Sequence, residues 1–304
     1  MVGRGAPQEV ARSAPEVFAI FGPTAAGKTA VAERLAERLG TEVVSADALQ
    51  VYRGLEILTN QPARPTHLVA IRELGEEMSL GEYAELAHDV IDGLVATNGA
   101  AVVTGGTGLY LRAALADLAI PPAPARGARE RWERLYDHDP RRAHACLRAL
   151  DPAAAATIHV NDRRRVVRAL ELAESGSSLV PEVGLLWSEE TRRSTLVVGL
   201  DVPAAALERR IRARTVEMLA RGAVDEARAA SSRPLSRSAA KALGLAELAS
   251  LPVEEALEHV VARTRRYAAY QRKWMRRIPG IVLLDATDPP EQVVDAILDL
   301  ARAR

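Results

Sequence analysis

The sequence predicts an α/β protein in which a parallel sheet carries a helical insertion. Five short apolar runs rich in β-branched residues alternate with helical patterns, as they do in strand–helix–strand units. These runs are Val17–Phe21, Glu42–Ser45, Ala100–Thr104, Thr195–Asp201 and Ile281–Asp285. Strand signals are missing over residues 116–193, where an arginine-rich helical pattern follows a Pro-rich stretch. We therefore expect residues 1–15 to form a flexible tail, residues 16–115 and 194–304 the core, and residues 116–193 the insertion.

Apolar residues at three- and four-residue spacing mark the helices between these runs. An amphipathic helix over Lys28–Leu39 follows the first run. Further helices are marked by Tyr83, Leu86, Ala87, Val90, Ile91 and Leu94, and then by Leu207, Ile211 and Met218, with Gly222 as the expected stop. A long helix over residues 253–277 has a stripe made of Val253, Leu257, Val260, Thr264, Tyr267, Gln271 and Trp274. This stripe would turn Tyr267 and Trp274 toward the core.

The composition narrows the functional classes. The 304-residue chain has 40 Lys and Arg against 40 Asp and Glu, and a neutral balance by itself argues against a nucleic-acid partner. The charges are segregated, however, because residues 73–92 hold seven acids and no Lys or Arg, whereas residues 263–277 hold seven basic residues and no acid. An RNA partner is therefore not excluded. The single cysteine, Cys146, rules out an internal disulfide framework and favours the cytoplasm. No apolar run is long enough to span a membrane, and the six histidines lack metal-ligand spacing.

A phosphate-binding loop follows the first predicted strand and precedes the first predicted helix. It matches G-x-x-x-x-G-K-[ST] and consists of Gly22, Pro23, Thr24, Ala25, Ala26, Gly27, Lys28 and Thr29. The glycines let backbone N–H groups converge on phosphate oxygens, Lys28 adds a full charge, and the Thr29 hydroxyl can ligate Mg²⁺. The chain has only three lysines, so a chance match is improbable. The loop predicts a di- or triphosphate ligand but does not name the reaction, because kinases, NTPases and some transferases share it.

Two polar residues follow neighbouring strands at the same edge of the predicted sheet. Asp47 comes directly after the second strand, where it could accept a proton from a substrate or hold Mg²⁺ through water. A helix N-cap is the alternative role for this aspartate. Thr107 lies among glycines after the third strand, where the backbone can approach a ligand closely; a plain tight turn is the alternative there.

Arginine-rich faces are expected on two helices. In residues 263–277 the basic groups are interleaved with tyrosines and a tryptophan, which suits an RNA backbone and splayed bases. A solvated helix with a structural aromatic stripe is the alternative. The second face lies in the insertion, where Arg164, Arg165 and Arg168 follow a possible helix cap at residues 161–162.

Five segments of the chain, in this order, resemble the tRNA dimethylallyltransferase family (isopentenylpyrophosphate:tRNA transferases). They read GPTAAGKT at 22–29, SADALQVYRG at 45–54, GGTGLY at 105–110, NDRRRVVRALE at 161–171 and RTRRYAAYQRKW at 263–274. The likeness covers nearly the whole chain after the tail. It implies a P-loop kinase-like core with a tRNA-binding helical insertion. It also implies transfer of the dimethylallyl group from dimethylallyl diphosphate to N6 of the adenosine on the 3′ side of the anticodon, with release of diphosphate. The expected partners are the anticodon stem-loop and dimethylallyl diphosphate, the expected cofactor is Mg²⁺, and a monomer is expected.

The resemblance also assigns roles to residues. Asp47 would take the proton from N6, Thr107 would position the reacting groups, and the phosphate loop would bind the diphosphate. Lys28 and Arg214 would support that leaving group, and Thr29 would ligate the metal. The residues implied in tRNA binding are Asp47, Ala48, Leu49, Gln50, Arg129, Arg164, Arg165, Arg168, Gln271, Arg272, Trp274 and Arg276.

Four departures from the family pattern affect details of RNA contact. Gln61 stands where lysine is usual, Thr66 where a histidine pair is frequent, Leu245 where tyrosine is common, and Tyr270 where a basic residue is frequent. Three other functions compete with the tRNA enzyme: a prenyltransferase acting on free AMP or ATP, a small-molecule P-loop kinase, and a nucleotide-binding module without turnover. The first rival needs no extended RNA surface, so the two basic faces count against it.

Overall fold

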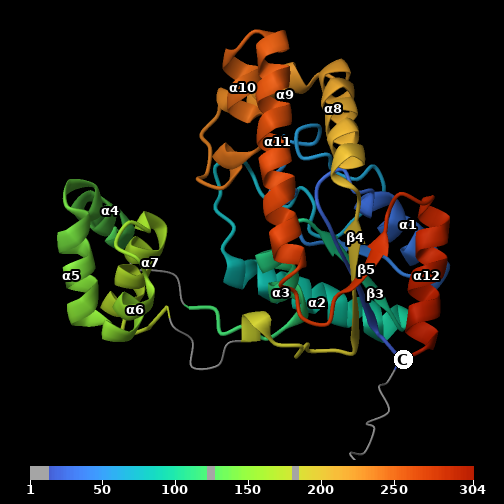
Figure 1. Cartoon of the computed structure of the whole chain (residues 1–304), viewed down its shortest axis with the longest axis horizontal. Coiled ribbons are helices and arrows are strands. Elements are labelled where there is room, and N and C mark those ends of the chain that lie inside the picture. Colours follow the sequence, from blue (N-terminus) through green and yellow to red (C-terminus); the bar gives the residue numbers. More distant parts are fainter. Residues whose placement is uncertain (1–13, 122–126, 180–184) are drawn as a thin grey trace, which may run out of the picture. The chain divides into compact units, whose positions relative to one another are not determined.

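The computed structural model describes residues 14–121, 127–179 and 185–304. Two compact units make up the chain: one contains residues up to Asp117 together with Leu186–Arg304, and the other is Leu118–Leu185 (Figure 1). Residues 1–13 of the expected tail lie outside the described residues.

A five-stranded parallel sheet forms the centre of the first unit, as the sequence predicted. Its strands are β1 (Val17–Phe21), β2 (Val43–Ser45), β3 (Ala101–Gly105), β4 (Thr195–Asp201) and β5 (Val282–Asp285), in the order β2-β3-β1-β4-β5. Every residue of β1 is buried. Because β1 lies between β3 and β4, the loops that follow these strands meet at one edge of the sheet.

Helices pack on this sheet and extend from it (Figure 1). They are α1 (Lys28–Leu39), α2 (Leu80–Asn98), α3 (Gly108–Leu115), α8 (Ala204–Ala220), α9 (Ala223–Ser231), α10 (Leu245–Ser250), α11 (Val253–Met275) and α12 (Pro290–Arg302), with single 3-10 turns at Leu185–Trp187 and Ala239–Lys241. One core cluster joins the sheet to α1 and α12, through residues such as Ile20, Leu35 and Ile297. None of the helices in the described ranges combines the length and the apolarity that a bilayer crossing demands.

The buried face of α11 differs from the predicted stripe. It consists of Ala256, Val260, Val261, Ala268, Gln271 and Met275. Val253 is exposed, and Tyr267 and Trp274 are only half-buried. The helix contacts α8, α10 and α3 at different points along its length, so its buried side shifts around the axis and a single stripe does not describe it.

The second unit is helical, as expected from the sequence. It contains α4 (Ala128–His138), α5 (Pro140–Leu150), α6 (Pro152–Thr157) and α7 (Arg163–Glu174) around a core of its own. Asp162, rather than Asn161, caps α7, because its carboxylate accepts from the Arg165 N–H at 3.1 Å.

The C-terminal limit of the insertion differs from the sequence estimate. The compact unit ends at Leu185, whereas the expected insertion ran to residue 193. The reason lies in buried Arg112 of α3, whose guanidinium donates to the carbonyl oxygens of Leu186 (3.1 Å) and Glu190 (3.3 Å). In addition, the Arg192 N–H donates to the Leu115 carbonyl, so the segment from 186 onward belongs to the core.

Candidate active site

Three loops converge at the carboxyl edge of the sheet. The phosphate loop follows β1, residues 46–51 follow β2, and the glycine-rich turn follows β3. A Cβ at Gly105 would overlap the backbone of Ala46, so only glycine permits these two loops to touch. The sequence placed these segments at one edge, and the structure brings them together.

The phosphate loop has the shape of an anion-binding nest. Ala25 and Gly27 adopt left-handed backbone conformations (φ 63° and 90°), and α1 begins directly after the loop. Successive backbone N–H groups in such a turn point to one side, and the helix N-terminus adds partial positive charge. The Lys28 ammonium folds back over the loop and donates to the Pro23 carbonyl at 2.9 Å.

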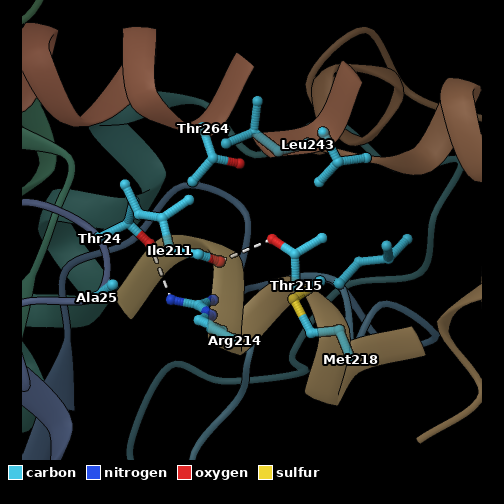
Figure 2. A pocket seen from close by; sticks show the side chains of 10 residues that line it. Thr24, Ala25, Ile211, Arg214, Thr215, Met218, Leu243 and Thr264 are labelled. Atoms are coloured by element: carbon cyan, nitrogen blue, oxygen red, sulfur yellow. Dashed lines mark hydrogen bonds between the residues drawn. The ribbon is translucent and has the colours of Figure 1, made fainter. Parts of the chain in front are cut away.

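Arg214 reaches this loop from α8. Its Nη1 donates to the Thr24 hydroxyl at 2.8 Å (Figure 2). Burial lowers the pKa of Lys28 to about 8, Asp47 acts against this shift, and the positive charge of Arg214 adds to it. Burial also lowers the pKa of Arg214. Two half-buried cations therefore flank the place where the loop would hold an anion.

Asp47 lies within electrostatic range of both cations. Burial raises its pKa, and the N–H groups of Leu49 and Gln50 together with Lys28 and Arg214 oppose that rise. The Leu49 N–H donates to Asp47 Oδ1 at 3.0 Å. The chain forms a turn from residue 48 onward and no helix, so the alternative of a helix N-cap is wrong.

Thr107 connects the glycine-rich turn to the Asp47 loop. Its hydroxyl accepts from the Ala48 N–H at 3.3 Å, and the Tyr267 side chain of α11 hydrogen-bonds to it as well. Burial raises the pKa of Tyr267, so that phenol stays protonated. Sequence reasoning placed Tyr267 in the core and missed this contact, which the helical position of Tyr267 alone does not show.

The expectation that Gln271 contacts RNA does not fit its place in the structure. Its side chain is 2% exposed and its amide is hydrogen-bonded inside the protein, to Thr24 and Gly106. The amide is therefore not available to a ligand at the surface.

The other residues expected to bind tRNA in the core unit differ in how accessible they are. Ala48 and Leu49 lie half-buried in the turn after β2, and Arg276 is exposed beyond α11. The Gln50 amide is bound internally, since it accepts from the Ser45 hydroxyl at 2.8 Å and donates to two carbonyls. Arg272 forms an ion pair with Asp201 at 2.8 Å.

Trp274 lies over the start of α3, where a Cβ at Gly108 would overlap its ring. The Trp274 indole packs against Trp187 with ring centroids 4.9 Å apart. The Arg277 guanidinium stacks on the Trp187 ring, 3.9 Å from its centroid. No sequence signal pointed to Trp187, which lies in a single helical turn without periodicity.

In the second unit, two of the expected tRNA-binding arginines turn toward a buried carboxylate. Glu171 accepts from Arg168 at 3.1 Å, and Arg129 lies 3.3 Å from its other oxygen. Arg164 and Arg165 are exposed. A polyanion could reach these two guanidiniums without breaking a buried contact, whereas Arg163, also exposed on α7, donates to the exposed Asp137 carboxylate.

The structure places the four residues that depart from the family pattern. Gln61 donates to the carbonyls of Tyr52 (2.7 Å) and Gln50 (3.2 Å) and so braces the Asp47 loop. Leu245 is buried at the start of α10. Tyr270 is 54% exposed and accepts from the Trp274 indole, and the Thr66 hydroxyl donates to Arg64 at the surface.

One hydroxyl beside the phosphate loop, that of Thr29, is a hard oxygen donor of the kind that Mg²⁺ accepts. No cluster of three or more His, Cys, Asp or Glu suited to a metal occurs in the described part of the chain. The Thr29 hydroxyl in the first turn of α1, together with the oxygens of a bound diphosphate, forms a hard donor set of the kind Mg²⁺ accepts, since this ion usually keeps several waters. The residues present therefore fit Mg²⁺.

A small cavity lies between the phosphate loop, α8 and α11 (Figure 2). Its volume is about 30 Å³, and its walls include Ile211, Met218, Leu243 and Thr264. One or two water molecules fit this space. It is too small for a five-carbon chain.

The fold and site define a phosphate-loop α/β enzyme in which a carboxylate, Asp47, lies within electrostatic range of two cations, and the comparisons identify the family. The chain matches a family model described as IPP transferase over residues 50–278, and one described as isopentenyl transferase over residues 15–72. The tRNA dimethylallyltransferase of Anaeromyxobacter dehalogenans (strain 2CP-C) is 41% identical over 90% of this chain and 95% of its own length. That of Geobacillus thermodenitrificans (strain NG80-2) is 34% identical over 92% and 93%.

Solved structures agree with these matches. The tRNA isopentenylpyrophosphate transferase of Bacillus halodurans superposes with a TM-score of 0.67 at 29% identity, covering 94% of this chain and 96% of its own. A eukaryotic dimethylallyltransferase, solved acting on tRNA, gives a TM-score of 0.76 at 24% identity and supports the fold alone. The chain belongs to the tRNA dimethylallyltransferase family.

Proposed function

We propose that the chain transfers the dimethylallyl group of dimethylallyl diphosphate to N6 of the adenosine 3′ to the anticodon in tRNA and releases diphosphate. The observation that carries the proposal is the placement of a carboxylate, Asp47, within electrostatic range of Lys28 and Arg214 across the edge of the sheet. A base and an anion site on adjoining loops are what a displacement between an amine and a diphosphate ester needs.

The phosphate loop would act on the leaving group. As the bond between C1 of the allyl group and the bridging oxygen breaks, its electron pair moves onto the diphosphate. Lys28, Arg214 and the loop N–H groups are oriented in advance toward that growing charge, and they stabilise the transition state more than the substrate. Mg²⁺ held by Thr29 would neutralise further charge on the diphosphate.

Asp47 would act on the nucleophile. The N6 lone pair forms the new bond to C1, and the proton of the amine passes to the Asp47 carboxylate. An adenine amine is a poor nucleophile, so a hydrogen bond from it to the carboxylate helps as the bond forms. Burial raises the pKa of Asp47, which makes it a stronger base than an exposed aspartate.

The RNA would be held mainly by charge. Exposed arginines on α7 and beyond α11 suit phosphates of an anticodon stem-loop, and the target base must leave its stack to reach the allyl carbon. The proposal takes a cytoplasmic monomer as the working form, which light scattering on the purified protein would check.

The test is to incubate the protein with dimethylallyl diphosphate, Mg²⁺ and an unmodified anticodon stem-loop, and to analyse the nucleosides by mass. N6-dimethylallyladenosine at the expected position is the predicted product, and its absence, where a known transferase produces it, would contradict the proposal. Asp47→Asn should lower turnover about 10²- to 10⁴-fold and leave stem-loop binding unchanged. Asp89→Asn, the same change at an exposed position of α2, is the matched control.

Two further arms separate the rival functions. Equimolar AMP in the same reaction shows whether a free nucleotide competes as acceptor, which the AMP or ATP prenyltransferase predicts. Replacing dimethylallyl diphosphate by ATP and measuring its consumption tests the kinase.

A further inference from the structure

The side chain of Gln271 lies between two of the loops that form the site. Its Oε1 accepts from the backbone N–H of Thr24 in the phosphate loop at 2.8 Å. Its Nε2 donates to the carbonyl of Gly106 in the turn after β3 at 2.9 Å. The side chain is 2% exposed, so water does not compete for either bond. One amide group thus holds two loops that come from different strands.

The turn after β3 is shaped to admit this amide. A Cβ on Gly106 would overlap Gln271 Nε2, so the close approach requires glycine at this position. One helical turn earlier, Tyr267 hydrogen-bonds both to Thr107 and to the Gln271 side chain. The residues around the amide therefore fix its orientation as well as its position.

Hydrogen bonds continue from this amide into both halves of the site. On one side Thr24 accepts from Arg214 through its hydroxyl at 2.8 Å. On the other side Gly106 precedes Thr107, whose hydroxyl accepts from the N–H next to Asp47. In the proposed reaction the phosphate loop and Arg214 bind the diphosphate. Thr107 and Asp47 act on the amine.

We infer that Gln271 is a positioning residue, which sets the separation between the diphosphate site and the Asp47–Thr107 site. The inference rests on the proposed function. A displacement needs the nucleophile and the leaving group aligned, and an error of about 1 Å can cost about 10²-fold in rate. We call the two hydrogen bonds from Gln271 to Thr24 and Gly106 the clamp. Losing the clamp should therefore lower kcat more than it weakens the binding of either substrate.

Gln271→Met tests this split. It retains the length of the side chain and removes both hydrogen bonds. We expect kcat to fall at least tenfold and the KM for dimethylallyl diphosphate to change by less than about threefold. A variant with the kcat of the unmodified enzyme would overturn the inference.

Gln271→Glu gives a readout that a packing role would not produce. Above its pKa the new carboxylate cannot donate to the Gly106 carbonyl and repels it, so activity is low. Burial raises the pKa of a carboxyl group, and the protonated acid regains an O–H donor of the right length. The ratio of variant to unmodified kcat should therefore rise at least fivefold as the pH falls from 8 to 5.5. The ratio removes the pH dependence that the two enzymes share.

Gln292→Glu, the same change at an exposed position of α12, should give a ratio that does not vary with pH. A flat ratio for Gln271→Glu as well would overturn the inference.

Amide hydrogen exchange tests the clamp without any turnover. In Gln271→Met, exchange should be faster in peptides covering residues 22–28 and 104–108 and unchanged in α12. Unchanged exchange in both loop peptides would overturn the inference whether or not the protein transfers a prenyl group. If the unmodified protein forms no product, the proposed function fails, and the exchange result still decides the clamp.

Discussion

The pKa of Lys28 leads to a prediction for the alkaline side of the pH–rate profile. An exposed lysine stays charged to pH 10, whereas burial lowers the pKa of Lys28 to about 8. In the proposed reaction the group binds the diphosphate only as an ammonium, so activity should be present below this pKa and lost as the pH rises through it. The ammonium fraction is about one half at pH 8, about one in eleven at pH 9 and about one in a hundred at pH 10.

We therefore expect kcat/KM for dimethylallyl diphosphate to fall about fivefold between pH 8 and 9 and about tenfold more by pH 10. This parameter reports the ionisation of the free enzyme. Lys28→Arg should lower kcat/KM overall and remove the alkaline fall, because a guanidinium stays charged throughout. Circular dichroism at each pH verifies that the fold persists. A constant kcat/KM up to pH 9.5 in the unmodified enzyme would refute the argument from burial.

Three further predictions concern the acid limb, the RNA face and two glycines. Because burial raises the pKa of Asp47 above 3.8, kcat should decline as the pH falls through that raised value, and Asp47→Asn should show no such decline in its residual rate. Replacing Arg164 and Arg165 by Gln should reduce the slope of log Kd against log salt for the stem-loop by about 1.4, and an unchanged slope would place the RNA elsewhere. Gly108→Ala should destabilise the protein by about 1–3 kcal/mol, because the new Cβ overlaps the Trp274 ring. Gly93→Ala in α2 has open space around the new Cβ and should stabilise the protein by about 0.5–1 kcal/mol. Urea unfolding measures both, and shifts of the same sign would contradict the packing argument.

Much of the core could be predicted because buried parallel strands are continuous apolar runs. The strands β1 and β4 were located to the residue, and β2, β3 and β5 to within one residue at each end. The convergence of the phosphate loop, Asp47 and Thr107 followed from strand order, since parallel neighbours end at the same edge.

What sequence reasoning missed depends on tertiary contacts. Aspartate favours helix caps and turns alike, so the turn at Asp47 could not be told from a cap. A glutamine on a helical stripe is equally compatible with a surface contact and a buried clamp, and only the loops around Gln271 distinguish the two. The end of the insertion depends on Arg112, a buried charge that no periodicity reveals.

The chain has as many acidic as basic residues, and some of the acids neutralise arginines of α11. This limits how strongly α11 and the residues after it can attract RNA. Of the seven basic residues in 263–277, three form ion pairs with acids from other elements: Arg263 with Glu247, Arg265 with Glu208, and Arg272 with Asp201. Within the part of the chain that the structure describes, four remain for phosphates, and at about 0.7 per single-strand contact they account for a salt slope of about 3. A measured slope well above 3 therefore requires phosphate contacts from outside residues 263–277, for which the exposed Arg164 and Arg165 of the second unit are candidates. A slope of 3 or less that is also insensitive to Arg164 and Arg165 would assign the RNA to the face of α11 alone.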